Sequence, residues 1–158
     1  MLSQRLAVAL FVLVATGLMA GEPPGPDTPK KDMDAIQGTW KVVALEADGQ
    51  QAPPEIVAAL KLVFKGETLT FSPGEPGFTN YNFKLDPTTK PASFDMTHAD
   101  GPHKGETEEG IYLLEGNHLK ICLGTAGNRP KTFATTAPSG KGVYSAGKGL
   151  YTLERVTP

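Results

Sequence analysis

From residue 61 onward the chain consists of short segments in which apolar and polar residues alternate, separated by glycine and proline turns. Tyr81 to Asp86 and Ala92 to Thr97 show this alternation, as strands with one wet face do. Gly66 with Glu67, and Gly116 with Asn117, supply short turns between neighbouring segments. This pattern is typical of an antiparallel meander, and it limits the fold more than any other feature of the sequence.

The sequence predicts about nine strands and little helix. The predicted strands are 38–47, 62–64, 68–71, 81–86, 92–97, 109–115, 119–123, 131–135 and 149–156. A single helical turn at 32–37 should precede the first strand, and the one convincing helix, 53–60, should follow it. An open sheet of so many short strands would expose its edges and one apolar face. We therefore predict an all-β domain, an antiparallel up-and-down barrel of about eight to nine strands with one short helix after the first strand.

The N-terminal segment has the features of an export signal followed by a tether. Arg5 supplies a positive charge, residues 6–14 are apolar but too short to span a bilayer, and residues 15–20 are small, so we expect cleavage after Ala20. Residues 21–31 are rich in proline and glycine and are predicted to be flexible. Residues 32–158 then form one domain. We expect an exported protein, periplasmic or extracellular, with no stable membrane insertion after signal removal.

Charge and cysteine content narrow the possible partners. Lysine and arginine number 15 against 17 aspartates and glutamates, a net charge of −2, and no basic stripe is present. A nucleic-acid partner is therefore not expected. Cys122 is the only cysteine and cannot form an intramolecular disulfide. We interpret it as a small residue of the core or of the barrel wall.

The densest polar segment, Asp95 to Glu106, raises the question of a metal site. His98 and His103 could supply nitrogen ligands, with aspartate oxygens beside them. Their spacing of five fits neither one face of a strand nor one face of a helix, and Gly101 with Pro102 turns the chain between them. We predict a solvated hairpin loop, no metal site and no cofactor.

Acidic residues near this loop are the remaining candidates for catalysis. Glu106, Glu108 and Glu109 could form a carboxylate set for acid and base chemistry. Glutamates beside a glycine turn more often form a charged strand edge that blocks edge pairing. The sequence contains no nucleophile elbow, phosphate loop or metalloprotease helix. We therefore expect the protein not to be an enzyme.

Aromatic residues alternate along the predicted strands and should point into the barrel. They are Phe64, Phe71, Tyr81, Phe83, Phe94, Tyr112 and Tyr151. They could line a pocket of roughly a few hundred Å³ for a small apolar or amphipathic ligand. They could equally fill the interior, which would leave a structural or protein-interaction domain that works through its surface.

Two features at opposite ends of the chain resemble the lipocalin and calycin barrels: Gly38-Thr39-Trp40 and Arg155. The resemblance implies that Trp40 packs at the closed end of the barrel with Arg155 across its ring. Further segments, from Gln37-Gly38-Thr39-Trp40 through Phe83-Lys84-Leu85-Asp86 to Leu119-Lys120-Ile121-Cys122, are similar to an exported, lipocalin-like domain family abundant in planctomycete bacteria. That resemblance implies a fold but no activity. We expect an exported, non-enzymatic domain that binds a small ligand.

Overall fold

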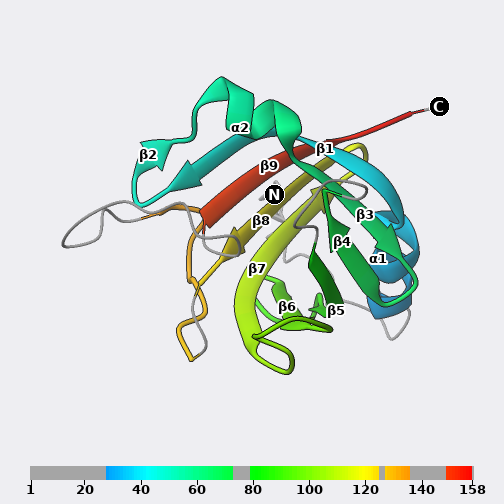
Figure 1. The fold of residues 1–158 in the computed structure, drawn as a ribbon. Helices are drawn as coiled ribbons and strands as arrows, with labels where there is room; N and C mark the ends of the chain where they lie inside the picture. The colour runs from blue at the N-terminus through cyan, green and yellow to red at the C-terminus, as the bar shows by residue number, and fades with distance from the viewer. Residues whose placement is uncertain (1–27, 73–78, 125–126, 136–148, 158) are drawn as a thin grey trace, which may run out of the picture.

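The computed structural model describes residues 28–72, 79–124, 127–135 and 149–157. The predicted export signal and residues 21–27 of the predicted tether lie outside these ranges. The elements follow the order α1 (Thr28–Ile36), β1 (Gly38–Ala47), β2 (Gln50–Gln51), α2 (Pro54–Ala59), β3 (Lys61–Lys65), β4 (Thr68–Phe71), β5 (Thr79–Asp86), β6 (Ser93–His98), β7 (Thr107–Glu115), β8 (His118–Leu123) and β9 (Gly149–Arg155) (Figure 1). Among the described residues, neither helix has the length and apolar character needed to cross a membrane.

The strands form one closed antiparallel sheet. Each strand from β3 to β8 pairs with the next along the chain, and β1 pairs with β3 on one side and β9 on the other (Figure 1). Eight strands thus close into a barrel, and β2 is an extra strand at the end of β1. Closure removes the free edges that an open sheet would have. The predicted all-β, up-and-down barrel is confirmed.

One predicted strand, 131–135, is wrong. β8 pairs directly with β9, from His118 opposite Glu154 to Leu123 opposite Gly149, so no strand can lie between them. Residues 131–135 instead follow an irregular path on the outside of the barrel.

The additional strand is β2, which the sequence did not indicate. Gln50 and Gln51 are both exposed and polar, and two residues are too few to show a period. They follow a turn in which Asp48 and Gly49 have positive φ angles of 54° and 72°. Asp-Gly with two positive φ angles is a preferred hairpin turn, and it folds β2 back onto β1.

One helix precedes β1 in the chain, and the other lies between β2 and β3. α1 begins at Thr28, so residues 28–31, predicted to be tether, belong to a helix that ends in the buried Ile36. Proline is tolerated in a first helical turn, so Pro29 is compatible with this start. α2 occupies 54–59, close to the predicted 53–60, with proline in its first turn.

A β-bulge in β1 changes which residues face the interior. The pairing with β9 places Val42 opposite Leu153 and Ala44 opposite Thr152, so Val43 is the extra residue. Val43 is 40% exposed, whereas Val42 and Leu45 are both buried. The bulge therefore explains why β1 has apolar residues on both faces of a simple alternation.

A second, smaller buried layer lies on the outside of the barrel. Ile111 and Cys122 are register partners whose neighbours along each strand point inward, so both face outward. Both are nevertheless buried. Residues 127–135, which we call the outer strap, pass beside Cys122, whose thiol lies 3.9 Å from the Ala134 carbonyl oxygen. Burial raises the pKa of this thiol, and Cys122 is a wall residue as predicted.

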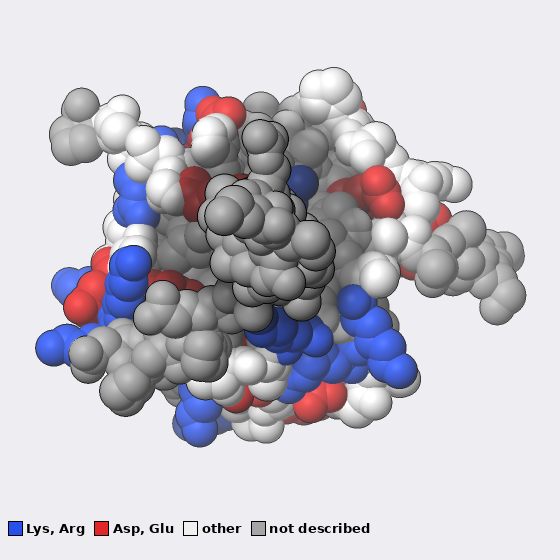
Figure 2. Space-filling model, turned by 180° about the vertical axis from the view of Figure 1, so that it is seen from behind, with Lys and Arg blue, Asp and Glu red and all other residues white. Residues whose placement is uncertain are grey.

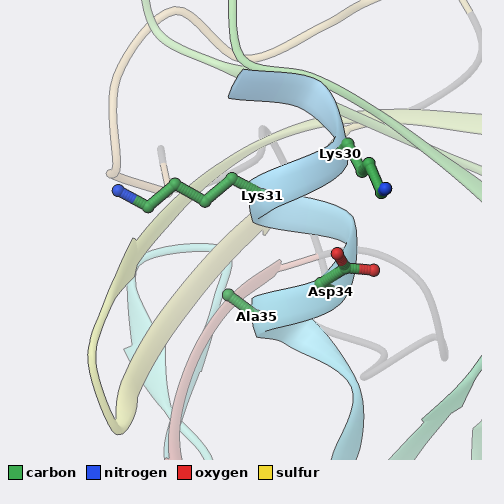
Figure 3. Close-up of a pocket in the computed structure, with 4 residues that line it drawn as sticks. All are labelled: Lys30, Lys31, Asp34 and Ala35. Atoms are coloured by element: carbon green, nitrogen blue, oxygen red, sulfur yellow. The ribbon is translucent and has the colours of Figure 1, made fainter. Parts of the chain in front are cut away.

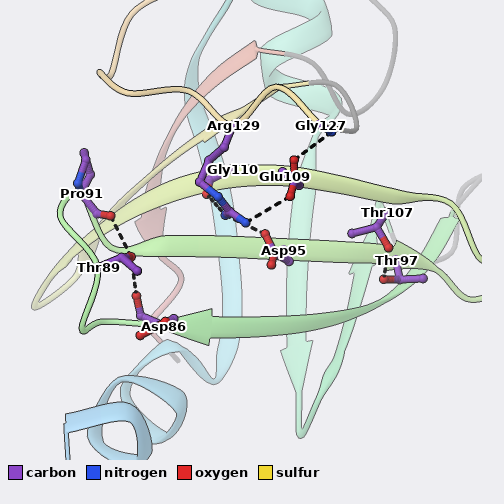
Figure 4. Close-up of polar contacts among 10 residues, drawn as sticks. All are labelled: Asp86, Thr89, Pro91, Asp95, Thr97, Thr107, Glu109, Gly110, Gly127 and Arg129. Atoms are coloured by element: carbon purple, nitrogen blue, oxygen red, sulfur yellow. Dashed lines mark hydrogen bonds and ion pairs between the residues drawn. The ribbon is translucent and has the colours of Figure 1, made fainter.

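Arg129 fixes the outer strap to the barrel (Figure 4). Its Nη1 donates to the Gly110 carbonyl oxygen at 2.7 Å and lies 2.7 Å from the Asp95 carboxylate. Its Nη2 lies 3.5 Å from the Glu109 carboxylate, which also accepts a bond from the Gly127 backbone N–H at 2.8 Å. These contacts raise the pKa of the Arg129 guanidinium, chiefly through Asp95. The strap is therefore held by charge-assisted bonds to β6 and β7.

Candidate functional site at one end of the barrel

The connections between strands divide the barrel into two ends. The helix end carries α1, the β3–β4 and β7–β8 turns and the β5–β6 connection. The loop end carries the connections β1–β3, β4–β5, β6–β7 and β8–β9. The interior side chains therefore form layers between these two ends, and the layers differ in chemistry.

At the helix end, Trp40 is fully buried and Arg155 lies over its ring, with Cζ 4.2 Å from the ring centroid. The indole Nε1 donates to the Ile36 carbonyl oxygen at 2.8 Å. The two guanidinium Nη atoms donate to the carbonyl oxygens of Gln37, at 2.5 Å, and Ala35. The contact expected between Trp40 and Arg155 is therefore present. The hydrogen bonds of the two side chains also cap the C-terminus of α1.

Gly38 makes room for this arrangement. Its φ is 111°, a value that residues with a side chain rarely adopt. A Cβ at this position would lie 3.3 Å from Arg155 Nη1. The backbone conformation therefore favours glycine at the first position of the Gly-x-Trp motif, and a side chain there would also crowd the guanidinium.

Tyr112 belongs to the helix end as well. Its hydroxyl donates to the Asp32 carboxylate at 2.6 Å and so connects β7 with α1. Burial, followed by this bond to Asp32, raises the pKa of Tyr112. Tyr112 was predicted to line a ligand pocket, but its hydroxyl is engaged in a contact between two elements of the fold.

Phenylalanines fill the middle of the barrel. Phe64 contacts Phe83 and Phe94 edge to face, with centroids 5.1 and 6.5 Å apart, and Phe83 stacks on Phe94 at 5.9 Å. All of them are buried, as is Met96 beside them. These rings contact one another as core residues do.

At the loop end, Phe71 lies between two tyrosines. Its ring centroid is 5.4 Å from that of Tyr81 and 5.9 Å from that of Tyr151. Both tyrosines are buried, while Phe71 is only half-buried. Phe71 is therefore the ring of this layer that retains exposed apolar surface.

A histidine and a glutamate complete the loop-end layer. His98 Nε2 lies 3.2 Å from Glu108 Oε1, and the two side chains are 13% and 17% exposed. Glu108 is paired with the inward-facing Met96, and the His98 ring lies 4.5 Å from that of Tyr81. An imidazole and a carboxylate thus lie inside the barrel wall, where both retain some contact with solvent.

The structure separates the glutamates that sequence reasoning grouped as a strand edge. Glu106 lies on the exposed β6–β7 turn, with its carboxylate 3.2 Å from His103 Nδ1. Glu109 faces outward to Arg129, whereas Glu108 faces inward. The signal that could have found Glu108 is its position two residues before Gly110 and four before the buried Tyr112 on the same strand face.

The pKa of the Tyr81 hydroxyl is shifted by its surroundings in this layer. Burial, then the negative charge of Glu108 and the proximity of Tyr151, raises the pKa of Tyr81 to about 12. The Tyr81 hydroxyl is therefore neutral at physiological pH.

The prediction of a solvated loop is right for His103, which is exposed on the β6–β7 turn, and wrong for His98, which ends β6 with its side chain 13% exposed. The two rings have centroids 5.6 Å apart. Each imidazole pairs with a different glutamate. Among the described residues, no group of three or more histidine, cysteine, aspartate or glutamate side chains is arranged to hold a metal ion.

A surface depression of about 560 Å³ lies beside α1, lined by Lys30, Lys31, Asp34 and Ala35 (Figure 3). The two lysine side chains point away from each other, so their charges do not converge on one ligand. On the face of the molecule shown in Figure 2, acidic and basic side chains both occur.

Comparison with family models, curated protein sequences and solved structures gave no match to this chain. The family resemblance therefore stays a prediction.

Proposed function

We propose that the protein is an exported, non-enzymatic, lipocalin-like domain that binds a small amphipathic ligand at the loop end of the barrel. The observation that carries this proposal is the loop-end layer itself. There the half-buried Phe71 ring lies in the same layer as the inward His98–Glu108 pair, which remains partly exposed. An apolar wall with a few convergent polar groups is the usual composition of a small-molecule site.

The depth of the proposed site follows from the packing below it. Phe64, Phe83 and Phe94 contact one another and are buried, so the ligand rests above this layer. Its apolar part packs against Phe71 and Tyr151, and its polar part binds His98 and Glu108. Export is supported by residues 1–20, and a non-enzymatic role by the missing catalytic motifs.

The alternative is a structural or protein-interaction domain with a filled barrel. It is favoured by the same central phenylalanines, which pack as a core and not as a cavity wall. Under this alternative the loop-end polar groups serve only to hydrate the end of the barrel.

Native mass spectrometry distinguishes these proposals. The protein is purified gently from the cells that produce it, and its mass is compared before and after denaturation. A discrete added mass that disappears on denaturation supports a bound small molecule. A native mass equal to the denatured mass, together with no mass shift on adding small amphipathic compounds at millimolar concentration, would favour the filled barrel.

A further inference from the structure

The outside of the barrel, from β1 across β3 and β4 to β5, carries lysines and neutral polar side chains. We propose that this surface, which we call the lysine face, binds an acidic polysaccharide whose carboxylate groups pair with the lysines. Its members are the outward residues Lys41, Lys61, Lys65, Thr68, Asn82 and Lys84. The lysine face lies on the outer wall, so this inference is independent of the ligand proposed at the loop end.

The first two strands bring three of the lysines together. Leu62 and Phe64 of β3 are buried in the interior, so Lys61 and Lys65, which alternate with them, point outward. Lys61 is the register partner of Lys41 on β1, and all three lysines are exposed. Like charges on directly opposed residues destabilise a sheet, and an anion bound between them offsets the repulsion.

The next two strands add neutral polar groups and a fourth lysine. Lys65 lies opposite Thr68 on β4, which lies opposite Asn82 on β5. Thr68 and Asn82 are exposed, as is Lys84, which follows the buried Phe83. A hydroxyl and an amide can donate hydrogen bonds to sugar oxygens and accept them from sugar hydroxyls. The lysine face therefore offers groups for both the charge and the hydroxyls of an acidic sugar.

Two of the carboxylates nearest to this face lie at its borders and are paired. Glu154 on β9 lies 3.0 Å from the Lys41 ammonium, and Asp95 on β6 lies 2.7 Å from Arg129. The exposed Glu67 occupies the β3–β4 turn, whereas β3 and β4 themselves contain no acidic residue. The strands at the centre of the face thus leave its positive charge uncompensated.

The spacing of the lysines fits a polymer better than a small anion. In the part of the chain that the structure describes, no ion pair includes Lys61, Lys65 or Lys84. Lys61 and Lys65 are four residues apart on one strand, roughly 13 Å, and β5 lies two strands from β3, roughly 10 Å. A small anion does not span these distances, whereas a chain with a charge on each repeating unit does.

The composition of the face favours a polysaccharide over a membrane or a nucleic acid. The aromatic side chains of β3, β4 and β5 belong to the interior, and the half-buried Val63 is the aliphatic residue between Lys61 and Lys65. Surfaces that bind membranes insert apolar side chains, and proteins that bind single-stranded nucleic acids stack bases on aromatic rings. Lysine with threonine and asparagine provides neither contact.

Isothermal titration calorimetry of the purified protein with polygalacturonate and with neutral dextran tests the inference. We expect polygalacturonate to bind about tenfold or more tightly than dextran. The binding should weaken as NaCl is added, because the lysines are exposed and their charges are screened. No binding of polygalacturonate, or equal binding of dextran, would overturn the inference.

Two further probes distinguish the class of macromolecule. Single-stranded DNA and vesicles of phosphatidylglycerol are titrated in the same buffer. We expect both to bind more weakly than polygalacturonate, because the lysine face provides neither stacking rings nor apolar side chains for insertion. Tighter binding of either one would replace the polysaccharide with a nucleic acid or a membrane as the partner.

A pair of matched variants assigns the binding to the lysine face. The first replaces its three lysines that form no ion pair: Lys61→Gln, Lys65→Gln and Lys84→Gln. The control replaces three exposed lysines elsewhere: Lys90→Gln, Lys104→Gln and Lys120→Gln. Both variants lose three positive charges, so they have the same net charge.

The first variant should bind polygalacturonate about tenfold or more weakly than the wild type, and the control should bind within about threefold of it. An equal loss in both variants would show that net charge and not the lysine face attracts the polymer, and the inference would fail. Undiminished binding in the first variant would also contradict it. Circular dichroism verifies that both variants fold.

Discussion

The polar side chains at the two ends of the barrel differ in their bonding partners and in their exposure to solvent. At the helix end, the side chains of Trp40 and Arg155 donate to carbonyl oxygens at the end of α1 and just after it. At the loop end, His98 and Glu108 pair with each other and keep part of their surface exposed. Polar side chains that bond two elements together contribute to stability, whereas we propose that the pair at the loop end contacts a ligand.

The tyrosines show the same contrast. The Tyr112 hydroxyl is bonded to Asp32 of α1, so it joins two elements of the fold. Tyr81 lies beside His98 and near the charge of Glu108, in the layer that faces the loops. Substitutions should therefore affect stability strongly at the helix end and weakly at the loop end.

Trp40→Ala should have the largest effect. It removes a fully buried indole, the bond to Ile36 and the surface on which Arg155 rests. We expect a loss of about 3 to 5 kcal/mol in the free energy of unfolding. Urea denaturation followed by circular dichroism measures it. Near-wild-type stability would show that the helix end does not hold the barrel closed.

Arg155→Met should come second. Methionine fills part of the volume but leaves the Gln37 and Ala35 carbonyl oxygens without their charged donor and removes the cation over Trp40. We expect a loss of roughly 3 kcal/mol, measured by the same unfolding experiment. If Arg155→Lys is as stable as the wild type, the planar guanidinium is not needed and this explanation is wrong.

Tyr112→Phe should cost about 1.5 kcal/mol at neutral pH, because a single hydrogen bond to a charged acceptor is lost. The folded state raises the pKa of Tyr112, so its contribution is complete below about pH 10 and is lost as the pH rises further. The difference between wild type and variant should therefore shrink in alkaline buffer. Thermal unfolding at several pH values checks this, and a difference that grows above pH 10 would reverse the assigned sign.

Glu108→Gln should have the smallest effect on stability, below about 1 kcal/mol, because the pair it breaks is partly exposed. Unfolding by urea provides the measurement. A loss as large as that of Arg155→Met would mean that the loop-end pair is structural, and the contrast between the ends would disappear.

Much of the fold could be predicted from local patterns. Alternation along strands such as Tyr81 to Asp86 predicted the barrel, and the paired features at Trp40 and Arg155 indicated how one end closes. The strand predicted at 131–135 failed because its absence depends on β8 pairing with β9, a contact between distant segments. Local sequence does not contain that information.

The candidate site was harder to predict than the fold. Glu108 was grouped with other acidic residues at a strand edge, although its spacing of four from Tyr112 puts both on one strand face. The register with Met96 shows that this face is the inner one. The bulge at Val43 likewise depends on the register of β1 with β9. Charged residues rarely face a protein core, so a reading based on the alternation of polar and apolar residues assigns a residue such as Glu108 to the surface.

We propose that one end of the barrel is structural and that the other end binds a ligand. Backbone amide NMR spectra recorded during a titration with 2-phenylethylamine test both halves of this proposal at once. We expect chemical-shift changes at Phe71, Tyr81, His98, Glu108 and Tyr151, and none at Trp40, Tyr112 or Arg155. Changes centred on the helix end, or no changes at saturating probe, would contradict the claim.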